Sequence, residues 1–273
     1  MVHLNRSVQT IEIRLLIGFM LLVCIMAGCS TEVNNLQRFG QLRLIESQEI
    51  EYFEGLKTAI PSDVLDELNK VHIDNYSLFS KDLGDSLISL FRYFEYTGVD
   101  FQADVNLLQK NSVIQQWNND LENVPMNDIL PGGDETPWKD MDEVFNFKGS
   151  PYNPDDADKQ PYGMVIGLRP EFIDSYTLLH KHAWPEVLEA IDKGNIRNYS
   201  IYLQEIRGGY YLFSYFEYIG TNFDADMAMV DSDPATIALM KFTDKACQLP
   251  LTTRADWEWW ARMRAILNPQ EQY

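Results

Sequence analysis

The same pattern occurs twice in this sequence, and that repeat constrains the fold more than any other feature. Residues 92–104 (RYFEYTGVDFQAD) match residues 214–226 (SYFEYIGTNFDAD) at eight of thirteen positions. Two further pairs of segments keep the same order at a spacing of 122 or 123 residues: 73–79 with 196–202, and 138–146 with 260–268. Because self-similarity at a fixed period is the signature of a repeated structural unit, two copies of one unit are expected.

Each copy has the hydrophobic pattern of a βαββαβ unit. In the second copy the successive segments are 163–168, 172–191, 198–204, 210–220, 233–247 and 263–267, and Pro185 is expected to start a second helical segment within 172–191. This order is the ferredoxin-like arrangement, whose sheet has one face free to pack. We therefore expect an α+β fold in which two ferredoxin-like βαββαβ repeats pack sheet to sheet as an intramolecular dimeric α+β barrel, a pseudo-dimer formed within one chain.

The two copies are separated by a segment rich in Pro, Asp and Asn, PYNPDDADKQP at 151–161, which is typical of a linker. The expected organisation is a lipoprotein signal peptide at 1–28, a tether at 29–36, repeat one at 37–150, the linker at 151–161, and repeat two at 162–273.

The amino terminus has the pattern of a targeting segment. An apolar run at 15–28 follows Arg6 and Arg14, and it suits the core of a signal peptide while being short for a membrane span. The sequence MAGCS at 26–30 resembles the bacterial lipobox, in which the cysteine, here Cys29, becomes the lipidated first residue. We expect a lipid anchor in the bacterial cell envelope, on the outer membrane facing the periplasm. An uncleaved membrane anchor and an ordinary secretory signal are the alternatives.

The charge and the cysteine content of the chain exclude several classes of partner and site. Asp and Glu outnumber Lys and Arg by 41 to 22, a formal net charge of -19, so the chain lacks the basic surface that nucleic acid binding requires. With Cys24 in the signal peptide and Cys29 lipidated, Cys247 has no partner for a disulfide or a cysteine metal site. We expect no metal, no cofactor and no nucleic acid partner.

The densest group of chemistry-bearing side chains lies at the start of repeat two. On one continuous helix Tyr176, His180 and Trp184 would share a face, at i, i+4 and i+8. An imidazole that titrates near neutral pH, beside a phenol and an indole, suits proton transfer on a sugar. The alternative is that the two aromatic residues belong to the core and His180 is a hydrogen-bonded helix residue. His182, two residues further on, points away from His180, which disfavours a shared metal.

The strand glutamates Glu95 and Glu217 alternate with aromatic residues in the repeated YFEY segment. They are interpreted either as carboxylates of the site or as solvent-facing side chains.

The run Tyr-x-x-x-His-x-x-x-Trp-Pro-Glu-Val-Leu at 176–188, followed by Asn-Tyr-Ser-Ile-Tyr-Leu at 198–203, resembles the L-rhamnose mutarotase family. The similarity covers nearly all of repeat two. Members of that family are small dimeric α+β barrels that interconvert the anomers of L-rhamnose without a cofactor. The resemblance implies that the family's catalytic Tyr and His fall on Tyr176 and His180, and its strand tyrosine on Tyr199.

The sequence departs from the family in two places. Family members usually carry a tandem Trp pair in the late helix, where repeat two has Leu239-Met240 and repeat one has Trp117-Asn118. Repeat one also lacks the histidine. Aligning Pro61 with Pro185 puts Tyr52 and Leu56 opposite Tyr176 and His180, whereas aligning Val64 with Val187 puts Phe53 and Lys57 there.

The function expected is that of a sugar mutarotase acting on a deoxyhexose such as L-rhamnose, by acid/base ring opening and closure. His180, Tyr176 and Tyr199 are the expected catalytic residues. Trp184, Asn198 and Glu217 are the expected substrate contacts. One alternative is a non-catalytic sugar-binding or scaffold lipoprotein on the same fold. A weaker one is a cofactor-free or haem-linked monooxygenase, since such enzymes use similar barrels.

Overall fold

The computed structural model describes residues 36–54, 60–120, 131, 137–153, 158–251 and 259–268, and these described residues form one compact unit. The predicted signal peptide at 1–28, Cys29 and the tether up to residue 35 lie outside the described residues. The lipid anchor and the envelope location therefore stay predictions. Within the described ranges, no helix combines the length and the apolar character that crossing a membrane requires.

The chain forms the expected α+β fold, because each repeat folds as a strand, helices, two strands, helices and a last strand. Repeat one comprises β1 (Gln37–Glu46), a 3-10 turn (Ser47–Glu49), α2 (Ile50–Glu54), α3 (Ser62–Lys70), β2 (Ile73–Gly84), β3 (Leu87–Tyr96), α4 (Phe101–Lys110), α5 (Ser112–Asp120), β4 (Lys139–Asp140) and β5 (Asp142–Phe147). Repeat two comprises β6 (Gln160–Leu168), a 3-10 turn (Pro170–Phe172), α7 (Ile173–Lys181), α8 (Pro185–Lys193), β7 (Ile196–Ile206), β8 (Gly209–Tyr218), α9 (Phe223–Ser232), α10 (Pro234–Cys247), β9 (Gln248–Leu249), β10 (Ala261–Arg262) and β11 (Arg264–Leu267).

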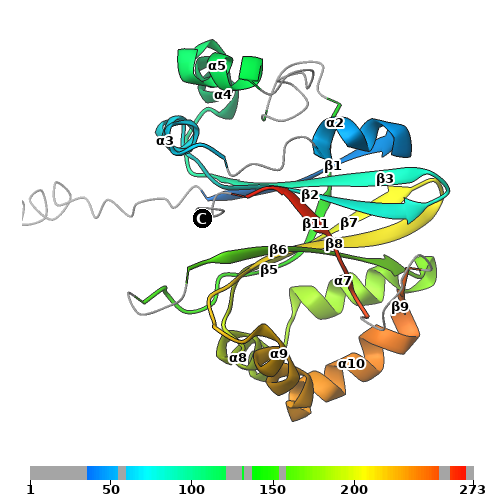
Figure 1. Ribbon diagram of the computed structural model, residues 1–273. Helices are drawn as coiled ribbons and strands as arrows, with labels where there is room; N and C mark the ends of the chain where they lie inside the picture. Colours follow the sequence, from blue (N-terminus) through cyan, green and yellow to red (C-terminus); the bar gives the residue numbers. More distant parts are fainter. Residues whose placement is uncertain are drawn as a thin grey trace, which may run out of the picture. The chain divides into compact units, whose positions relative to one another are not determined.

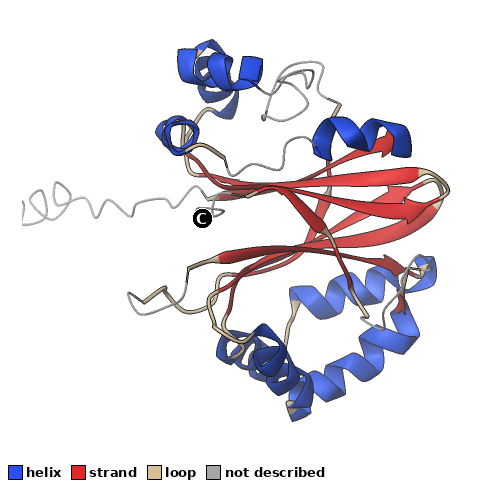
Figure 2. Cartoon of the chain, viewed as in Figure 1, coloured by secondary structure: helices blue, strands red, loops and turns tan. Residues whose placement is uncertain are grey.

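Two antiparallel sheets pack face to face, with the helices on the two outer faces (Figures 1 and 2). The first sheet has the strand order β11-β2-β3-β1-β4, and the second has the order β10-β6-β8-β7-β5. A buried core that contains Phe79, Phe91 and Tyr93 from the first sheet and Tyr202 and Phe213 from the second joins the two. The repeats thus form the intramolecular barrel expected from the sequence.

The last strand of each repeat joins the sheet of the other repeat. β4 pairs with β1 of its own repeat, and after Met141 the chain continues as β5, which pairs with β7 of repeat two. In the same way β10 pairs with β6, and β11 then pairs with β2 of repeat one. The segment MRAIL was expected to close its own repeat, but it closes repeat one instead. The local pattern of a strand does not encode its pairing partner, so the sequence could not show this exchange.

Two glycines allow the sheets to approach each other closely. A Cβ atom on Gly40 of β1 would lie 2.5 Å from the ring of Tyr202, and one on Gly163 of β6 would lie 2.6 Å from the ring of Phe79. Gly40 and Gly163, like Phe79 and Tyr202, occupy equivalent places in the two repeats. Each sheet thus seats an aromatic ring on a glycine of the other sheet, where no larger residue fits.

The helices that enclose the outer face of the second sheet begin at well-defined residues. Asn222 Oδ1 accepts a hydrogen bond from the backbone N–H of Ala225 at 3.2 Å, which caps α9. Asp233 Oδ1 accepts from Ala235 and Thr236, which caps α10. Both helices lie under β7 and β8 in Figure 1 and form the outer wall of the site described next.

Candidate active site

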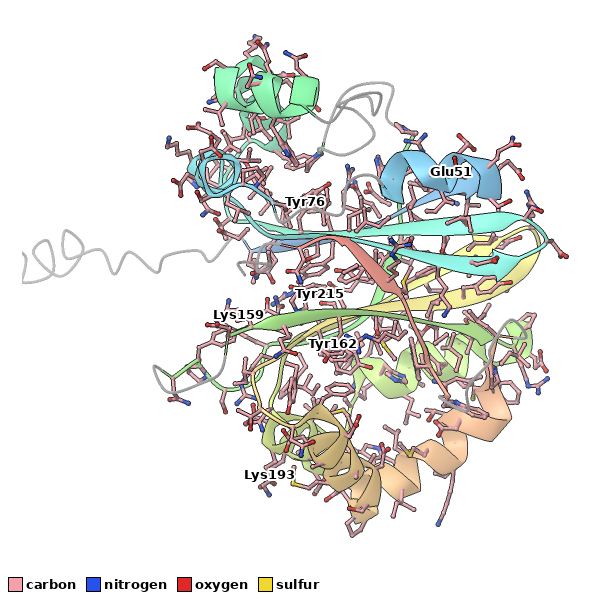
Figure 3. All side chains as sticks on the ribbon, viewed as in Figure 1. Glu51, Tyr76, Lys159, Tyr162, Lys193 and Tyr215 are labelled. Atoms are coloured by element: carbon pink, nitrogen blue, oxygen red, sulfur yellow. The ribbon has the colours of Figure 1, made fainter. Side chains whose placement is uncertain are left out.

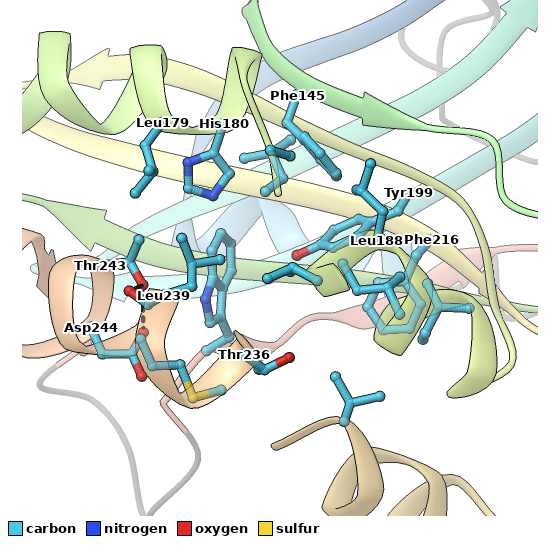
Figure 4. Close-up of a pocket in the computed structure, with 18 of the residues that line it drawn as sticks. Phe145, Leu179, His180, Leu188, Tyr199, Phe216, Thr236, Leu239, Thr243 and Asp244 are labelled. Carbon is cyan, nitrogen blue, oxygen red and sulfur yellow. Dashed lines mark hydrogen bonds between the residues drawn. The ribbon is translucent and has the colours of Figure 1, made fainter. Parts of the chain in front are cut away.

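A cavity of about 220 Å³ lies between the outer face of the second sheet and helices α7 to α10 (Figure 4). Its walls are mostly apolar, and its polar groups come from His180, Tyr176, Tyr199, Thr236, Thr243, Asp244, Gln248 and Trp260. The volume falls below the range of about 300 to 1,000 Å³ that holds drug-sized ligands, so the cavity suits a small ligand.

His180 lies near the end of α7, and its ring extends into this cavity (Figure 4). Its Nδ1 lies 2.9 Å from the backbone carbonyl oxygen of Tyr176. A carbonyl oxygen only accepts hydrogen bonds, so Nδ1 carries the proton and Nε2 keeps its lone pair. In the described part of the chain Nε2 has no hydrogen-bond partner. Burial lowers the pKa of His180 to about 4, so the imidazole is neutral at physiological pH and can act as a base.

Two tyrosines line the cavity together with His180. The ring of Tyr176 stacks on the imidazole with 3.9 Å between centroids, and Gln248 Nε2 donates to its hydroxyl at 3.4 Å. Burial raises the pKa of Tyr176 well above its usual value. Burial also raises the pKa of Tyr199 to about 12, although a hydrogen bond with Ser214 lowers it in part. Both phenols therefore keep their protons at neutral pH and can donate hydrogen bonds.

Trp184 does not share the face of Tyr176 and His180. Helix α7 ends at Lys181, and Trp184 has an extended backbone as the residue before α8. A new helix does begin at Pro185, as expected, and that break is the reason why the i, i+8 expectation is wrong. Trp184 lines a neighbouring groove between α7 and α10, which shares only the walls formed by Tyr176 and Leu179 with the cavity.

The structure does not bring Asn198 and Glu217 to the cavity. Asn198 Nδ2 donates to Glu217 Oε1 at 3.0 Å, and both side chains face the first sheet rather than the helices. Successive residues of a strand point to opposite faces, and it is the neighbouring Tyr199 and Phe216 that line the cavity. The six residues expected to form one site therefore separate into three places: the cavity, the groove and the space between the sheets. Contact of Asn198 or Glu217 with substrate stays a prediction.

The two strand glutamates belong to a hydrogen-bonded cluster between the sheets. Tyr93 and Tyr215 stack there with 3.7 Å between ring centroids, and Figure 3 shows Tyr215 between the two sheets. The hydroxyl of Tyr215 donates to Glu217 at 3.1 Å, and that of Tyr93 lies 2.9 Å from Glu95 and 3.2 Å from Asn198. Glu95 and Glu217 are 9% and 1% exposed, so the solvent-facing alternative is wrong for both.

Several cavity residues were missed by the sequence reasoning. Trp260 had a detectable signal, because it repeats Trp138 at a spacing of 122. Thr236 and Asp244 had a weaker one, since i and i+8 place them on one face of the predicted helix. Phe145 had none: it belongs to repeat one and reaches the cavity on the exchanged strand β5, where its ring lies 5.9 Å from that of His180.

In repeat one, a buried arginine lies beside Trp138 and Tyr76, which are the counterparts of the cavity residues Trp260 and Tyr199. Arg92 is the counterpart of Ser214 and is fully buried, and its Nε donates to Gln41 Oε1 at 2.9 Å. Its guanidinium lies 4.2 Å from the ring centre of Trp138, the counterpart of the cavity residue Trp260. Burial lowers the pKa of Arg92 to about 10 while a hydrogen bond with Tyr76 raises it, so the side chain stays charged.

The two alignments proposed for the missing histidine stay open. Leu56, Lys57 and the side chain of Tyr52 lie outside the described residues, and Phe53 is a 3% exposed core residue.

A sequence profile described as L-rhamnose mutarotase matches residues 38–147 and 161–270. The chain belongs to the L-rhamnose mutarotase family. Both repeats match, so the resemblance found in repeat two extends to repeat one. In this mutarotase-family chain, Leu239 and Met240 line the cavity.

Solved structures similar to this mutarotase-family chain share little sequence with it. A putative monooxygenase from Fusobacterium nucleatum is 13% identical, with 85% of this chain and 92% of that chain covered and a TM-score of 0.43. An anthrone oxidase-like protein is 11% identical, with 84% and 91% covered and a TM-score of 0.33. A chlorite dismutase variant from Candidatus Nitrospira defluvii is 11% identical, with 86% and 92% covered and a TM-score of 0.31. No curated protein matches the chain.

Among the residues that the structure describes, no three His, Cys, Asp or Glu side chains gather closely enough to hold a metal ion.

Proposed function

We propose that this protein interconverts the anomers of a deoxyhexose such as L-rhamnose in the cavity of repeat two. The observation that carries the proposal is the neutral imidazole of His180, whose Nε2 faces the cavity while Nδ1 is held by the backbone of Tyr176. Membership of the L-rhamnose mutarotase family supports the reaction class. The mostly apolar walls suit the methyl group and the C–H faces of a deoxyhexose.

In the proposed reaction, His180 Nε2 takes the proton of the anomeric hydroxyl. The anomeric carbon then becomes a carbonyl as its bond to the ring oxygen breaks, and the ring oxygen receives the hydroxyl proton of Tyr199. After rotation about the C1–C2 bond, the ring oxygen attacks the other face of the aldehyde. The two proton transfers then reverse, so His180 and Tyr199 return to their starting states.

The division of roles follows from the environments of the two side chains. The pKa of His180 is lowered to about 4, which keeps the base unprotonated, and the pKa of Tyr199 is raised to about 12, which keeps the donor protonated. Tyr176 supports the base through its ring, which stacks on the imidazole, and through its carbonyl oxygen, which holds Nδ1.

The test compares His180→Asn with His182→Asn, a matched control because His182 is exposed two residues away. Anomer exchange is measured by saturation-transfer NMR across a panel of free sugars, above the spontaneous rate. We expect His180→Asn to lower the catalysed rate about 100-fold or more, as typical for a lost general base, and His182→Asn to leave it unchanged. Equal rates for His180→Asn and the wild type would refute the site.

The sugar-binding alternative predicts a different result for the wild type. Saturable binding of a sugar with no exchange above the spontaneous rate would favour a non-catalytic protein. The loss of the Trp pair at Leu239 and Met240 and of the histidine in repeat one motivates this second candidate.

A further inference from the structure

Thr236 carries a buried hydroxyl group that nothing in the described part of the chain satisfies. The residue is 5% exposed, lines the cavity, and its Oγ1 has no hydrogen-bond partner. Its backbone N–H is already bonded to Asp233 Oδ1 at 3.1 Å, so the start of α10 does not need the hydroxyl. Burying a polar group without a partner is costly, and for a group that lines a cavity a bound water molecule or ligand can supply the missing hydrogen bond.

The other polar side chains on the cavity face of α10 are paired with each other. Thr243 Oγ1 lies 3.0 Å from Asp244 Oδ1 and 3.4 Å from the carbonyl oxygen of Leu239. Thr236 thus differs from Thr243, the same residue type seven positions later on the same helix. Between them Leu239 and Met240 present only apolar atoms to the cavity.

We propose that Thr236 is a specificity-determining residue, whose hydroxyl group binds one ring hydroxyl of the sugar at a position other than the anomeric carbon. Figure 4 shows Thr236 across the cavity from His180, so a sugar with its anomeric carbon at His180 presents a distant hydroxyl to Thr236. This inference rests on the proposed function for the position of the sugar. Leu239 and Met240 offer the sugar no hydrogen bond, so on this side of the cavity the hydroxyl of Thr236 is the group that distinguishes one sugar hydroxyl from another.

The test uses Thr236→Val, which removes the hydroxyl at nearly constant shape, and Thr236→Ser, which restores it. Thr177→Val on α7 is the matched control, since Thr177 lines neither the cavity nor the groove. Exchange is measured by NMR. Binding is measured with methyl L-rhamnosides, which cannot open, and with their monodeoxy analogues.

We expect Thr236→Val to raise KM and the Kd of the methyl glycoside about 3- to 10-fold, with kcat within about twofold, as typical for one lost hydrogen bond to a ligand. Thr236→Ser should recover most of this loss. One monodeoxy analogue, the one that lacks the hydroxyl bound by Thr236, should bind to Thr236→Val and to the wild type equally well. The melting temperature of Thr236→Val should be unchanged or higher, because a partnerless buried hydroxyl is replaced by a methyl group.

Failure of this inference differs from failure of the proposed function. If the wild type exchanges anomers while Thr236→Val keeps the wild-type KM and Kd, the inference is overturned and the function stands. If the wild type binds glycosides without exchange and Thr236→Val weakens that binding, the catalytic function is overturned and the inference stands. A lower melting temperature with unchanged sugar binding, or a wild type that binds none of the glycosides, overturns the inference as well.

Discussion

His180 owes its chemistry to one backbone atom and to its surroundings. The carbonyl oxygen of Tyr176 selects the tautomer, and burial in an apolar cavity disfavours the charged imidazolium. Exposed His182, two residues further along, has neither constraint. The same side chain therefore becomes a neutral base at one position and an ordinary surface group at the other.

The lowered pKa of His180 predicts the pH profile of the reaction. As pH falls through the pKa of about 4, Nε2 takes a proton and the base is lost, so the catalysed rate should fall there and stay level between about pH 5.5 and 8. Exchange rates at each pH, corrected for the spontaneous reaction, measure this, with circular dichroism to verify that the protein is folded. A midpoint near 6.5, the ordinary value for histidine, would show that His180 is exposed or is not the base.

At the level of elements, each exchanged strand brings residues of one repeat into the packing of the other repeat. β5 carries Phe145 of repeat one against His180 and Tyr199 of repeat two. β11 carries Leu267 of repeat two into the core of repeat one, where it is 1% exposed. The two residues occupy equivalent places, but only Phe145 touches the cavity.

This pair gives a matched test of the exchange. Phe145→Ala and Leu267→Ala should each lower the free energy of unfolding, by about 3 to 5 and about 2 to 5 kcal/mol respectively, because each leaves a cavity in a buried core. At a temperature where both variants are folded, only Phe145→Ala should change KM or kcat. Denaturant unfolding and NMR exchange measure the two effects. A change of kinetics in Leu267→Ala that matches that in Phe145→Ala would argue against a site confined to repeat two.

Much of the fold was predictable from the sequence, because the repeat and the local hydrophobic patterns identify the elements. Helix α10 and the helix start at Pro185 lie where those patterns place them. The exchange of β5 and β11 was not predictable, since any strand of suitable pattern can pair at an open edge. For the site, the sequence predicted that Tyr176, His180 and Tyr199 belong together. It did not predict the place of Trp184, because the helix breaks between α7 and α8. It did not predict the place of Asn198 either, because neighbouring strand residues point to opposite faces.

At the level of the whole molecule, the space between the sheets joins the two repeats. It holds the shared aromatic core and the buried cluster of Tyr93, Tyr215, Glu95 and Glu217. A single repeat would expose this face to water, together with two buried carboxylates and the free edge left by the missing strand. Each repeat is therefore expected to depend on the other for its stability.

Dividing the chain within the linker tests this dependence. The halves 36–153 and 158–268, expressed separately, should be insoluble or self-associate, and mixing them should recover one compact heterodimer with a cooperative unfolding transition. Size-exclusion chromatography and thermal unfolding of each half and of the mixture measure this. Two halves that are each monomeric, soluble and cooperatively folded would contradict the interdependence.

Arg92 shows what covalent linkage of the two subunits permits. In a symmetric homodimer one gene specifies both subunits, so an arginine at this position would be present in both at once. Here the two halves are encoded separately, and an arginine at position 92 coexists with a serine at position 214. One repeat can therefore carry a buried arginine at this position while the other repeat keeps its cavity. Two identical chains cannot differ from each other in this way.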